Sequence, residues 1–480
     1  MISSLFCSQI YKNIPKGLIS HALSFVTFVN MLRIKFKKSP NISLFPYQTY
    51  YVTIQSMEKK IKIGLIGLGT VGSGVFKTLQ NFKNIEVAKI AVRNKNKKRN
   101  IEGLDENIIT DNAYDVVNDP EIQIVAELVG GVEPAFDLIK TAIKNGKHIV
   151  TANKELLAKH GEELFNFAET NNKVVLYEAA IAGGIPLIMP IKTILAGNKI
   201  SKIKAILNGT TNYILTKMDV QGASYADVLD EAQKLGYAEA DPTGDVEGFD
   251  AAYKITTLAT IAFGKRIKFE NVYREGITKI SPDDMQAANE MGYKIKLIAS
   301  AELSEEGKAD VRVHPMLVPI SKTLAHIDYV TNAVSLTGHP VGDVTLSGPG
   351  AGEFPTASSV VGDILAIASE IGKTNYLLPM MRCNHHENAQ MIPVEETENK
   401  YYLSITAQNS LGVIGRIGKA CEEHNISLAS IVQKEVAGDN AAKITVITEI
   451  CKEKDMQNVV NIFNNDPAIT SVNSLIRVQV

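Results

Sequence analysis

Acidic side chains and a lysine are crowded into the segment GYAEADPTGDVEGFDAAYK, residues 236–254. The acids are Glu239, Asp241, Asp245, Glu247 and Asp250. Asp250 and Lys254 are four residues apart, so in a helix they share one face and can touch. At a surface such a pair contributes about 0.3–0.5 kcal/mol, whereas in a cleft the carboxylate would orient the lysine for proton transfer. The segment therefore predicts either a solvated charged face or a pocket for a cationic substrate.

A glycine-rich turn follows the apolar run 61–66 and reads Gly67-Leu-Gly69-Thr-Val-Gly72. Because it lies between a predicted strand and a predicted helix, it is typical of a dinucleotide-binding unit. Gly67 would make the tight turn, Gly69 would let the backbone approach a pyrophosphate, and Gly72 would let the helix pack on the strand. The pyrophosphate would lie at the helix N-terminus, against Thr70 and Val71. The alternative is a strand–helix turn that binds no ligand.

The residue at the end of the second predicted strand, IEVAKIAV, bears on cofactor choice. NAD-specific sites usually have an acid there to hold the ribose 2′-hydroxyl. This chain has Arg93, which can hold a 2′-phosphate. We therefore expect NADP(H) to be preferred, with NAD(H) as the alternative, and interpret the basic run 95–99 as a solvated loop.

Two further strands are predicted at 122–131 and up to Ala152, and a helix begins at Asn153–Lys154. Ligands bind at the carboxyl ends of parallel strands, so Lys154 is a candidate site residue. Glu178 falls inside an otherwise apolar predicted strand, where burial would require a cation, a lysine or backbone donors as its partner. Beyond it, ILNGTTNYIL predicts a strand, a turn and a helix, in which Thr210 and Asn212 face a ligand or cap the helix.

The composition excludes several classes of function. A formal net charge of −2 gives no electrostatic reason for nucleic acid or an anionic membrane as a partner. Four cysteines lie far apart without a CxxC pair, which suits a reducing compartment and leads us to expect a cytoplasmic protein. Residues 1–57 contain no Asp or Glu. They predict a disordered extension or a misassigned start, with Met57 as the true start; a transit peptide is the alternative.

From about Met57 to Leu378 the chain resembles homoserine dehydrogenase, through GLGTVGSGV, TANKELLA, YEAAIAGGIPLI, ILNGTTNYIL, LGYAEADPTGDVEGFDAAYK and GPGAG in that order. The resemblance implies NAD(P)H-dependent, reversible reduction of L-aspartate 4-semialdehyde to L-homoserine, on the route to threonine, methionine and isoleucine. It implies that Lys154 and Lys254 flank the reacting carbon, with Lys254 donating the proton. It also implies an amino-acid pocket lined by Glu239, Asp245, Asp250, Tyr237 and Thr210.

The same resemblance implies two further sites. One is a sodium ion held by Glu178 and by the backbone carbonyls of Ile181, Gly183 and Ile185. The other is closure over the cofactor by the glycine-rich stretch that contains Gly350 and Gly352. Taken alone, that stretch fits a crossover between domains equally well.

The C-terminal residues 399–480 predict a strand–helix–strand–strand–helix–strand unit, which is the ferredoxin-like βαββαβ fold. It resembles an ACT domain, in which the loop QNSLGV would expose backbone N–H groups to an effector. Asn409, Leu411 and Gly412 would then lie near the effector, and threonine is the effector that the combined resemblance implies. The alternative is a dimerisation module without an effector. A cut near Glu396 should remove inhibition and leave catalysis, because both lysines and the glycine-rich turn lie upstream.

The predicted fold is α/β with three parts. They are a Rossmann-type domain at 58–185 completed by about 350–378, an α+β substrate and dimerisation domain at 186–349, and the ACT domain after a linker at 379–398. A homodimer or homotetramer is expected. A nucleotide-bound, amino-acid-sensing regulator without catalytic activity is the alternative function; the presence of both lysines favours the enzyme.

Overall fold

The computed structural model describes residues 60–371, 383, 385–435 and 441–480. The expectations for residues 1–57 lie outside this range, as do those for linker residues 379–382 and 384. Among the described residues, no helix is both long and apolar enough to cross a membrane.

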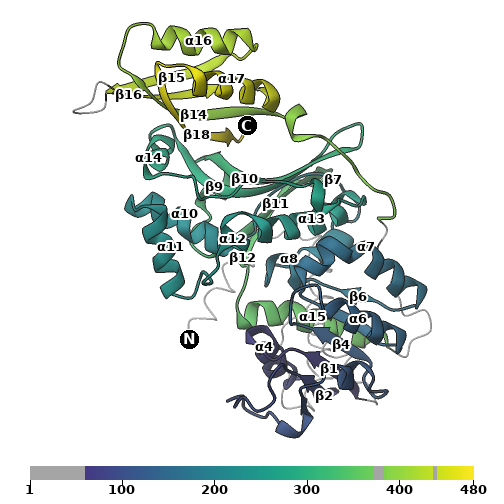
Figure 1. Cartoon of the computed structure of the whole chain (residues 1–480). Helices are drawn as coiled ribbons and strands as arrows, with labels where there is room; N and C mark the ends of the chain where they lie inside the picture. The colour runs from purple at the N-terminus through teal and green to yellow at the C-terminus, as the bar shows by residue number, and fades with distance from the viewer. Residues whose placement is uncertain (1–59, 372–382, 384, 436–440) are drawn as a thin grey trace, which may run out of the picture. The chain divides into compact units, whose positions relative to one another are not determined.

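The first part is a parallel sheet of six strands in the order β3-β2-β1-β4-β5-β6. The strands are β1 (Ile61–Ile66), β2 (Ile85–Ala91), β3 (Ile109–Thr110), β4 (Ile124–Glu127), β5 (His148–Thr151) and β6 (Val175–Leu176). The helices between them are α4 (Thr70–Leu79), α5 (Tyr114–Val117), α6 (Ala135–Lys144) and α7 (Lys154–Thr170). Figure 1 labels α4, α6 and α7 around this sheet. After β1, strands β2 and β3 are added on one side of it, and β4 then pairs with β1 on the other side. This reversal of strand order opens a ligand crevice at the carboxyl ends of β1 and β4.

Strand β4 is shorter than the sequence predicts because a buried acid turns the chain at its end. The Glu127 carboxylate accepts hydrogen bonds from the backbone N–H groups of Val129 (2.9 Å) and Gly130 (3.1 Å). Its other oxygen accepts one from the Thr151 hydroxyl at 2.6 Å. These bonds fix the loop after β4 beside the end of β5.

The second part is a mixed sheet with helices packed against it. Its strands are β7 (Lys199–Ile206), β8 (Tyr273–Arg274), β9 (Tyr293–Leu303), β10 (Lys308–Pro319), β11 (Thr331–His339) and β12 (Gly342–Pro349). Its helices are α8 (Ala179–Ala182), α9 (Ile188–Lys192), α10 (Gly209–Gln221), α11 (Tyr225–Lys234), α12 (Thr243–Val246), α13 (Phe249–Phe263) and α14 (Pro282–Glu290). Short 3₁₀ helices occur at Glu106–Ile108, Phe269–Asn271, Thr323–His326 and Val394–Glu396.

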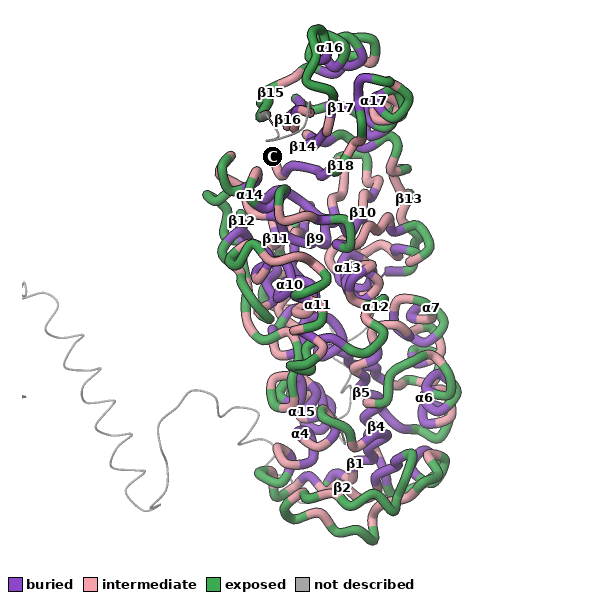
Figure 2. Tube along the Cα trace, turned by 60° about the vertical axis from the view of Figure 1, so that its left-hand side comes forward, coloured by how far each residue is buried: buried purple, intermediate pink, exposed green. Residues whose placement is uncertain are grey.

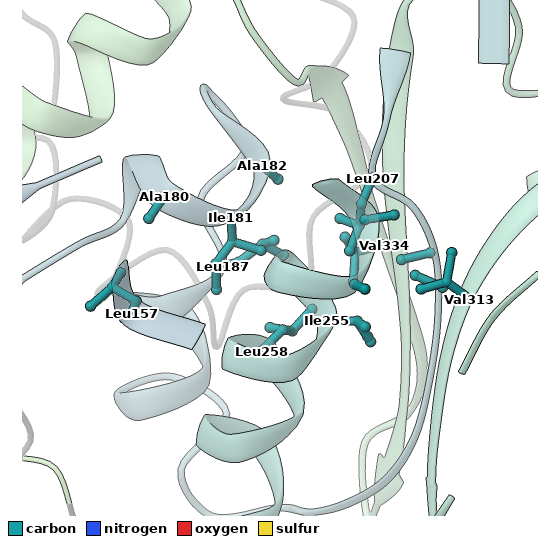
Figure 3. Close-up of a cluster of buried hydrophobic side chains, with 14 of the residues drawn as sticks. Leu157, Ala180, Ile181, Ala182, Leu187, Leu207, Ile255, Leu258, Val313 and Val334 are labelled. Atoms are coloured by element: carbon teal, nitrogen blue, oxygen red, sulfur yellow. The ribbon is translucent and has the colours of Figure 1, made fainter. Parts of the chain in front are cut away.

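Helix α13 is the central element of this part. Most of its residues are buried (Figure 2), and its apolar side chains belong to a core shared with α7, α8 and the sheet. Figure 3 shows this core around Ile255 and Leu258, with the side chains of Leu157, Ala180, Ile181, Ala182, Leu187, Leu207, Val313 and Val334. Burial on this scale fixes the position of the polar residues at the N-terminal end of α13.

After β12 the chain returns to the nucleotide-binding sheet as α15 (Glu353–Glu370), which lies beside α4 (Figure 1). The two helices approach closely at Gly74, where a Cβ atom would lie 2.6 Å from the Glu353 carbonyl oxygen. This glycine therefore allows α15 to pack on the helix that follows the glycine-rich turn.

The C-terminal part has the predicted βαββαβ order. Its elements are β14 (Glu398–Gln408), α16 (Val413–Glu423), β15 (Leu428–Glu435), β16 (Ala441–Thr448), the two-residue β17 (Cys451–Lys452), α17 (Glu453–Asn465) and β18 (Ile469–Val478). The expected α/β fold class with a ferredoxin-like C-terminal unit is thus confirmed.

This unit is joined to the catalytic part by more than a linker. Strand β18 pairs in parallel with β10, where Met316 lies opposite Arg477 and Leu317 opposite Val478. Before it, β13 (Gln390–Met391) also pairs with β10. The side chains of Tyr402, Ile447, Ile476 and Val478 belong to the core of the catalytic part. A cut near Glu396 would remove this sheet neighbour and uncover this core. The expected effect of such a cut on inhibition and catalysis stays a prediction.

Candidate active site

The Asp250 carboxylate lies between two lysines. Its Oδ2 accepts a hydrogen bond from Lys254 Nζ at 2.7 Å, and its Oδ1 is paired with Lys154 Nζ. Asp250 is 6 % exposed and Lys254 is 8 % exposed, so this part of the cluster is desolvated. The predicted Asp250–Lys254 pair is present, and it is a buried pair rather than a surface one.

Each lysine is placed by the end of a strand. Lys154 is the first residue of α7, directly after β5, and the preceding Asn153 caps this helix by accepting the Leu156 N–H at 3.1 Å. Lys254 also donates to the carbonyl of Leu207, which follows β7, at 2.8 Å. Because β5 and β7 belong to different sheets, the cluster forms where the two sheets meet.

Asn208 is a member of this cluster that the sequence reasoning missed. Its Nδ2 donates to Asp245 at 2.7 Å and to Asp250 at 2.9 Å, while its Oδ1 accepts the Thr211 N–H at 2.8 Å. Asparagine before an apolar helix is a helix-cap signal that could have located the start of α10. That signal could not have revealed contacts to acids 37 and 42 residues further along the chain.

The ionisation of the cluster follows from its charges. Burial raises the pKa of Asp250, but the two adjacent ammonium groups outweigh it and hold that pKa well below the usual value. Burial lowers the pKa of Lys254, and the positive charge of Lys154 lowers it further, against the pull of Asp250. The pKa of Lys154 is raised: burial opposes the rise, but attraction to Asp250 and to the acids of the segment outweighs it. The cluster thus holds one ordinary cation and one lysine that gives up its proton more readily.

The remaining predicted pocket residues lie around this cluster. Glu239 and Tyr237 are exposed, and the Thr210 hydroxyl donates to the Tyr237 carbonyl at 2.7 Å. Gly209 to Asn212 form the first turn of α10 rather than a separate turn before it. The Asn212 side chain binds backbone instead of facing a ligand. Its amide donates to the backbone carbonyls of Ile327 and Thr331.

The two acids of the segment without an assigned role differ. Asp241 is exposed and accepts the Thr243 N–H at 3.1 Å, so it lies at the start of α12. Glu247 is half-buried and accepts a solvent-exposed hydrogen bond from the Thr278 hydroxyl at 3.3 Å.

The glycine-rich turn has the geometry that a dinucleotide requires. Gly67 has φ +106°, which L side chains rarely adopt, and a Cβ at Gly72 would overlap the Gly67 carbonyl. A Cβ at Gly69 would meet nothing within 4 Å, so the backbone there is open to a ligand. Gly69 is the N-cap of α4, and the first turn of this helix, Thr70 and Val71 included, contains no acid. These features fit the pyrophosphate of a nicotinamide cofactor.

Arg93 lies two residues beyond β2, whose last residue, Ala91, accepts the Gly67 N–H at 2.8 Å. Its side chain is exposed and makes no hydrogen bond or ion pair with the rest of the described chain. Arg93 is therefore available to a group bound beside the glycine-rich turn.

Gly350 and Gly352 have structural reasons to be glycine. A Cβ at Gly350 would overlap the Asn332 side chain, and Gly352 has φ +116° at the start of α15. Gly183 packs against Gly350 so closely that a Cβ there would overlap the Gly350 carbonyl. These contacts account for the crossover; contact of Gly350 and Gly352 with a cofactor stays a prediction.

The prediction that Glu178 lies within a strand is wrong. Strand β6 ends at Leu176, and Glu178 is the N-cap of α8. Its carboxylate accepts the backbone N–H groups of Leu187, Ile188 and Met189, which begin α9. Backbone donors therefore compensate the burial of this acid. They are one of the three kinds of partner that the sequence predicted for it, beside a cation and a lysine.

The sodium ligand set stays a prediction. The Glu178 carboxylate accepts three N–H donors, and the Gly183 carbonyl accepts the Ser359 hydroxyl at 2.7 Å. A carboxylate has about four lone-pair sites and a carbonyl has two, so these contacts leave both groups able to accept a cation. Ile181 and Ile185 are buried beside them.

The proposed effector loop follows β14. Leu411 is fully exposed, Gly412 has φ +86° and is the N-cap of α16, and the Asn409 side chain accepts a hydrogen bond from Gln433 at 3.3 Å. The N–H groups at this helix N-terminus have no side-chain cap, as an anion-accepting loop would require.

Comparison with known proteins decides the family. Residues 186–365 match the family model of homoserine dehydrogenase, residues 67–178 its NAD-binding domain, and residues 401–468 the ACT domain. A homoserine dehydrogenase of Synechocystis sp. is 43% identical over 431 residues, 87% of this chain and 99% of that protein. The chain belongs to the homoserine dehydrogenase family.

Solved homoserine dehydrogenase structures agree. The structure from Thiobacillus denitrificans is similar with a TM-score of 0.83 at 39% identity, over 88% of this chain and 98% of that one. A hyperthermophilic archaeal homoserine dehydrogenase in complex with NADPH has a TM-score of 0.55 at 28% identity, over 64% and 97% of the two chains. The resemblance seen in the sequence is confirmed, and the chain is an NAD(P)-dependent oxidoreductase with homoserine dehydrogenase activity.

We predict that Asn208→Asp destabilises the protein by about 1–3 kcal/mol, because it removes the donor shared by Asp245 and Asp250 and adds a third carboxylate beside them. Urea unfolding followed by circular dichroism measures the change. Asn465→Asp, at the exposed end of α17, is the matched control. Equal unfolding midpoints for the two variants would show that the Asn208 bridge is not structural.

Proposed function

We propose that Lys254 donates the proton to the aldehyde oxygen when L-aspartate 4-semialdehyde is reduced to L-homoserine, and that Lys154 is the fixed cation beside it. The observation that carries this proposal is the Lys154–Asp250–Lys254 cluster. A lysine ammonium has three N–H donors. Lys254 uses one on Leu207 and one on Asp250, which leaves the third for a substrate oxygen.

The chemistry requires two deliveries to one carbonyl group. When bound, the reduced nicotinamide cofactor supplies the hydride that the carbonyl carbon accepts. The oxygen then gains negative charge, which an ammonium group neutralises by donating a proton, giving the alcohol. The lowered pKa of Lys254 suits it to release that proton, and the raised pKa of Lys154 keeps its charge in place.

The substrate's α-ammonium group needs acids that the lysines leave available. Both oxygens of Asp250 are occupied by Lys154, Lys254 and Asn208. We therefore assign the ammonium to Asp245 and Glu239, with Tyr237 and Thr210 lining the pocket, and assign Asp250 to holding the lysines. This assignment completes the explanation for the density of acids in the segment.

Lys254→Ala should lower kcat for semialdehyde reduction by about 10²–10⁴-fold, the usual contribution of one general acid, with the NADPH dissociation constant little changed. NADPH oxidation with aspartate semialdehyde measures it. Lys159→Ala, an exposed-face lysine of α7 paired with Glu155, is the matched control.

The same assay gives a pH test. Because the pKa of Lys254 is lowered from 10.5, the proton should be lost as pH rises through that lower value, and the reduction rate should fall there. Lys254→Arg should move this decline to higher pH, since guanidinium stays protonated. Near-wild-type turnover of Lys254→Ala would defeat the assignment, and absence of turnover in the unmodified protein would favour the regulator.

NADPH should bind more tightly than NADH. Arg93 takes the place of the usual acid after β2, and its side chain has no competing partner among the described residues. The archaeal relative in complex with NADPH supports the same preference. Arg93→Ala should bring the dissociation constants of NADPH and NADH closer together. Arg99→Ala, in the solvated loop, should leave the difference between them unchanged. Equal affinities of the unmodified protein for both cofactors would contradict the proposal.

Threonine is the effector that we propose for the ACT domain, bound by its carboxylate at the backbone of residues 411–413. It would inhibit only if it bound one arrangement of the protein better than another. Because the domain shares a sheet with the catalytic part, a point variant replaces truncation as the test. Asn409→Ala should raise the threonine concentration for half-inhibition, and Asn465→Ala should not. A full-length protein that threonine does not inhibit would contradict the effector's identity.

Two parts of the proposal rest on the resemblance alone: a homodimer or homotetramer, and a bound sodium ion, which no step above uses. The proposed cytoplasmic location rests on the widely spaced cysteines.

A further inference from the structure

We propose that Arg477 and Glu275 are positioning residues for the reaction, through which the C-terminal domain holds the acids and the lysine that receive the amino-acid substrate. The inference rests on the proposed function, since it concerns the same Asp245, Asp250 and Lys254. It assigns a role to a buried ion-pair network that the chemistry above does not use.

Arg477, on β18, is 2 % exposed and joins the two domains. Its Nε and Nη2 donate to both carboxylate oxygens of Glu453 on α17, at 2.9 and 2.8 Å. Its Nη1 donates to Glu275 at 2.8 Å and its Nη2 to the Tyr273 hydroxyl at 3.2 Å, in the catalytic part. A buried arginine divided between carboxylates of two domains fixes their relative position, because its planar fork bonds in set directions.

The contacted residues belong to the segment 273–277, which passes from Arg477 to the active-site acids. The Glu275 N–H donates to the carbonyl of Val313 in β10 at 2.8 Å, and the Ile277 N–H donates to the carbonyl of Val246, the last residue of α12, at 2.9 Å. A Cβ at Gly276 would overlap that same carbonyl. The segment therefore packs against the end of α12 without free space between them.

A second contact reaches the first turn of α13. The Arg274 guanidinium lies over the Phe249 ring, 3.7 Å from its centroid. Gly248, between α12 and α13, has φ +79°, and a Cβ there would meet the side chain of Val313 at 3.2 Å and the carbonyl of Glu275 at 3.7 Å. Asp245 lies three residues before Gly248 and Asp250 two residues after it.

The segment 273–277 thus supports the turn that sets Asp245 relative to Asp250 and Lys254. Loss of the Arg477–Glu275 pair should loosen this turn and weaken substrate binding. The glycine-rich turn belongs to the other sheet, so NADPH binding should be unaffected. A general loss of stability would not weaken the binding of aspartate semialdehyde while leaving the binding of NADPH unchanged.

The test is the full-length variant Glu275→Gln, which keeps the side-chain size and leaves Arg477 its pair with Glu453. KM for aspartate semialdehyde should rise by about 5- to 20-fold, the effect of weakening one charged hydrogen bond, while KM for NADPH stays within twofold. Glu275→Asp, which retains the charge, should recover most of the loss. Glu290→Gln is the matched control: it breaks the Lys434–Glu290 pair between α14 and β15, both of which lie outside the segment 273–277.

A readout without turnover separates this inference from the proposed function. In the ligand-free protein, amide hydrogen exchange in residues 243–250 should be faster in Glu275→Gln than in the unmodified protein, and unchanged in Glu290→Gln. Unchanged exchange there, or equal increases of both KM values, would overturn the positioning role. If the unmodified protein had no turnover, the exchange comparison alone would decide it, because it needs neither substrate.

Discussion

The structure depends on one buried carboxylate that is shared by two lysines. Asp250 accepts bonds from Lys154, Lys254 and Asn208. Lys154 and Asn208 follow strands β5 and β7 of two different sheets, whereas Lys254 shares helix α13 with Asp250. Two ammonium groups this close repel each other unless an anion lies between them. Removal of one partner from a buried ion pair typically costs about 3–5 kcal/mol. The same interaction therefore closes the domain junction and gives the lysines their unequal pKa values. The arrangement that we propose as catalytic is thus also a structural one.

The C-terminal domain is part of this arrangement because its last strand extends the catalytic sheet. Pairing of β18 with β10 places Arg477 beside the segment 273–277, and that segment reaches the turn between α12 and α13. A regulatory domain attached in this way does not need to move far, since small shifts at a packed interface are felt where the packing is continuous. The exposed loop at Leu411 and Gly412 lies in the same domain as Arg477, so an effector and the substrate acids can be coupled through one sheet.

Much of this was accessible from the sequence, where local pattern and chemistry agree. The glycine-rich turn between strand and helix, the i,i+4 spacing of Asp250 and Lys254 and the βαββαβ order are properties of short segments, and each is present. The bridging role of Asn208, the capping of α9 by Glu178 and the pairing of Arg477 with Glu275 are contacts between distant segments. Periodicity contains no information on them, because a polar residue in an apolar context predicts that it has a partner but not which one. The pairing of β18 with β10 was missed for a related reason: a polar linker is visible in the sequence, whereas strand pairing across domains is not.

The central claim, that Asp250 acts through the lysine it holds, is tested most directly by a double-mutant cycle on kcat for semialdehyde reduction with Asp250→Asn, Lys254→Ala and the double variant. When two residues act as one unit, replacing either of them removes the contribution of both. The free-energy effects of the two single substitutions on kcat therefore do not add in the double variant. The account predicts that Asp250→Asn lowers kcat strongly in the unmodified protein and changes it by less than about threefold when Lys254 is already alanine, the scatter expected for independent effects. Losses that multiply in the double variant would contradict it and would mean that Asp250 and Lys254 contribute to the reaction separately.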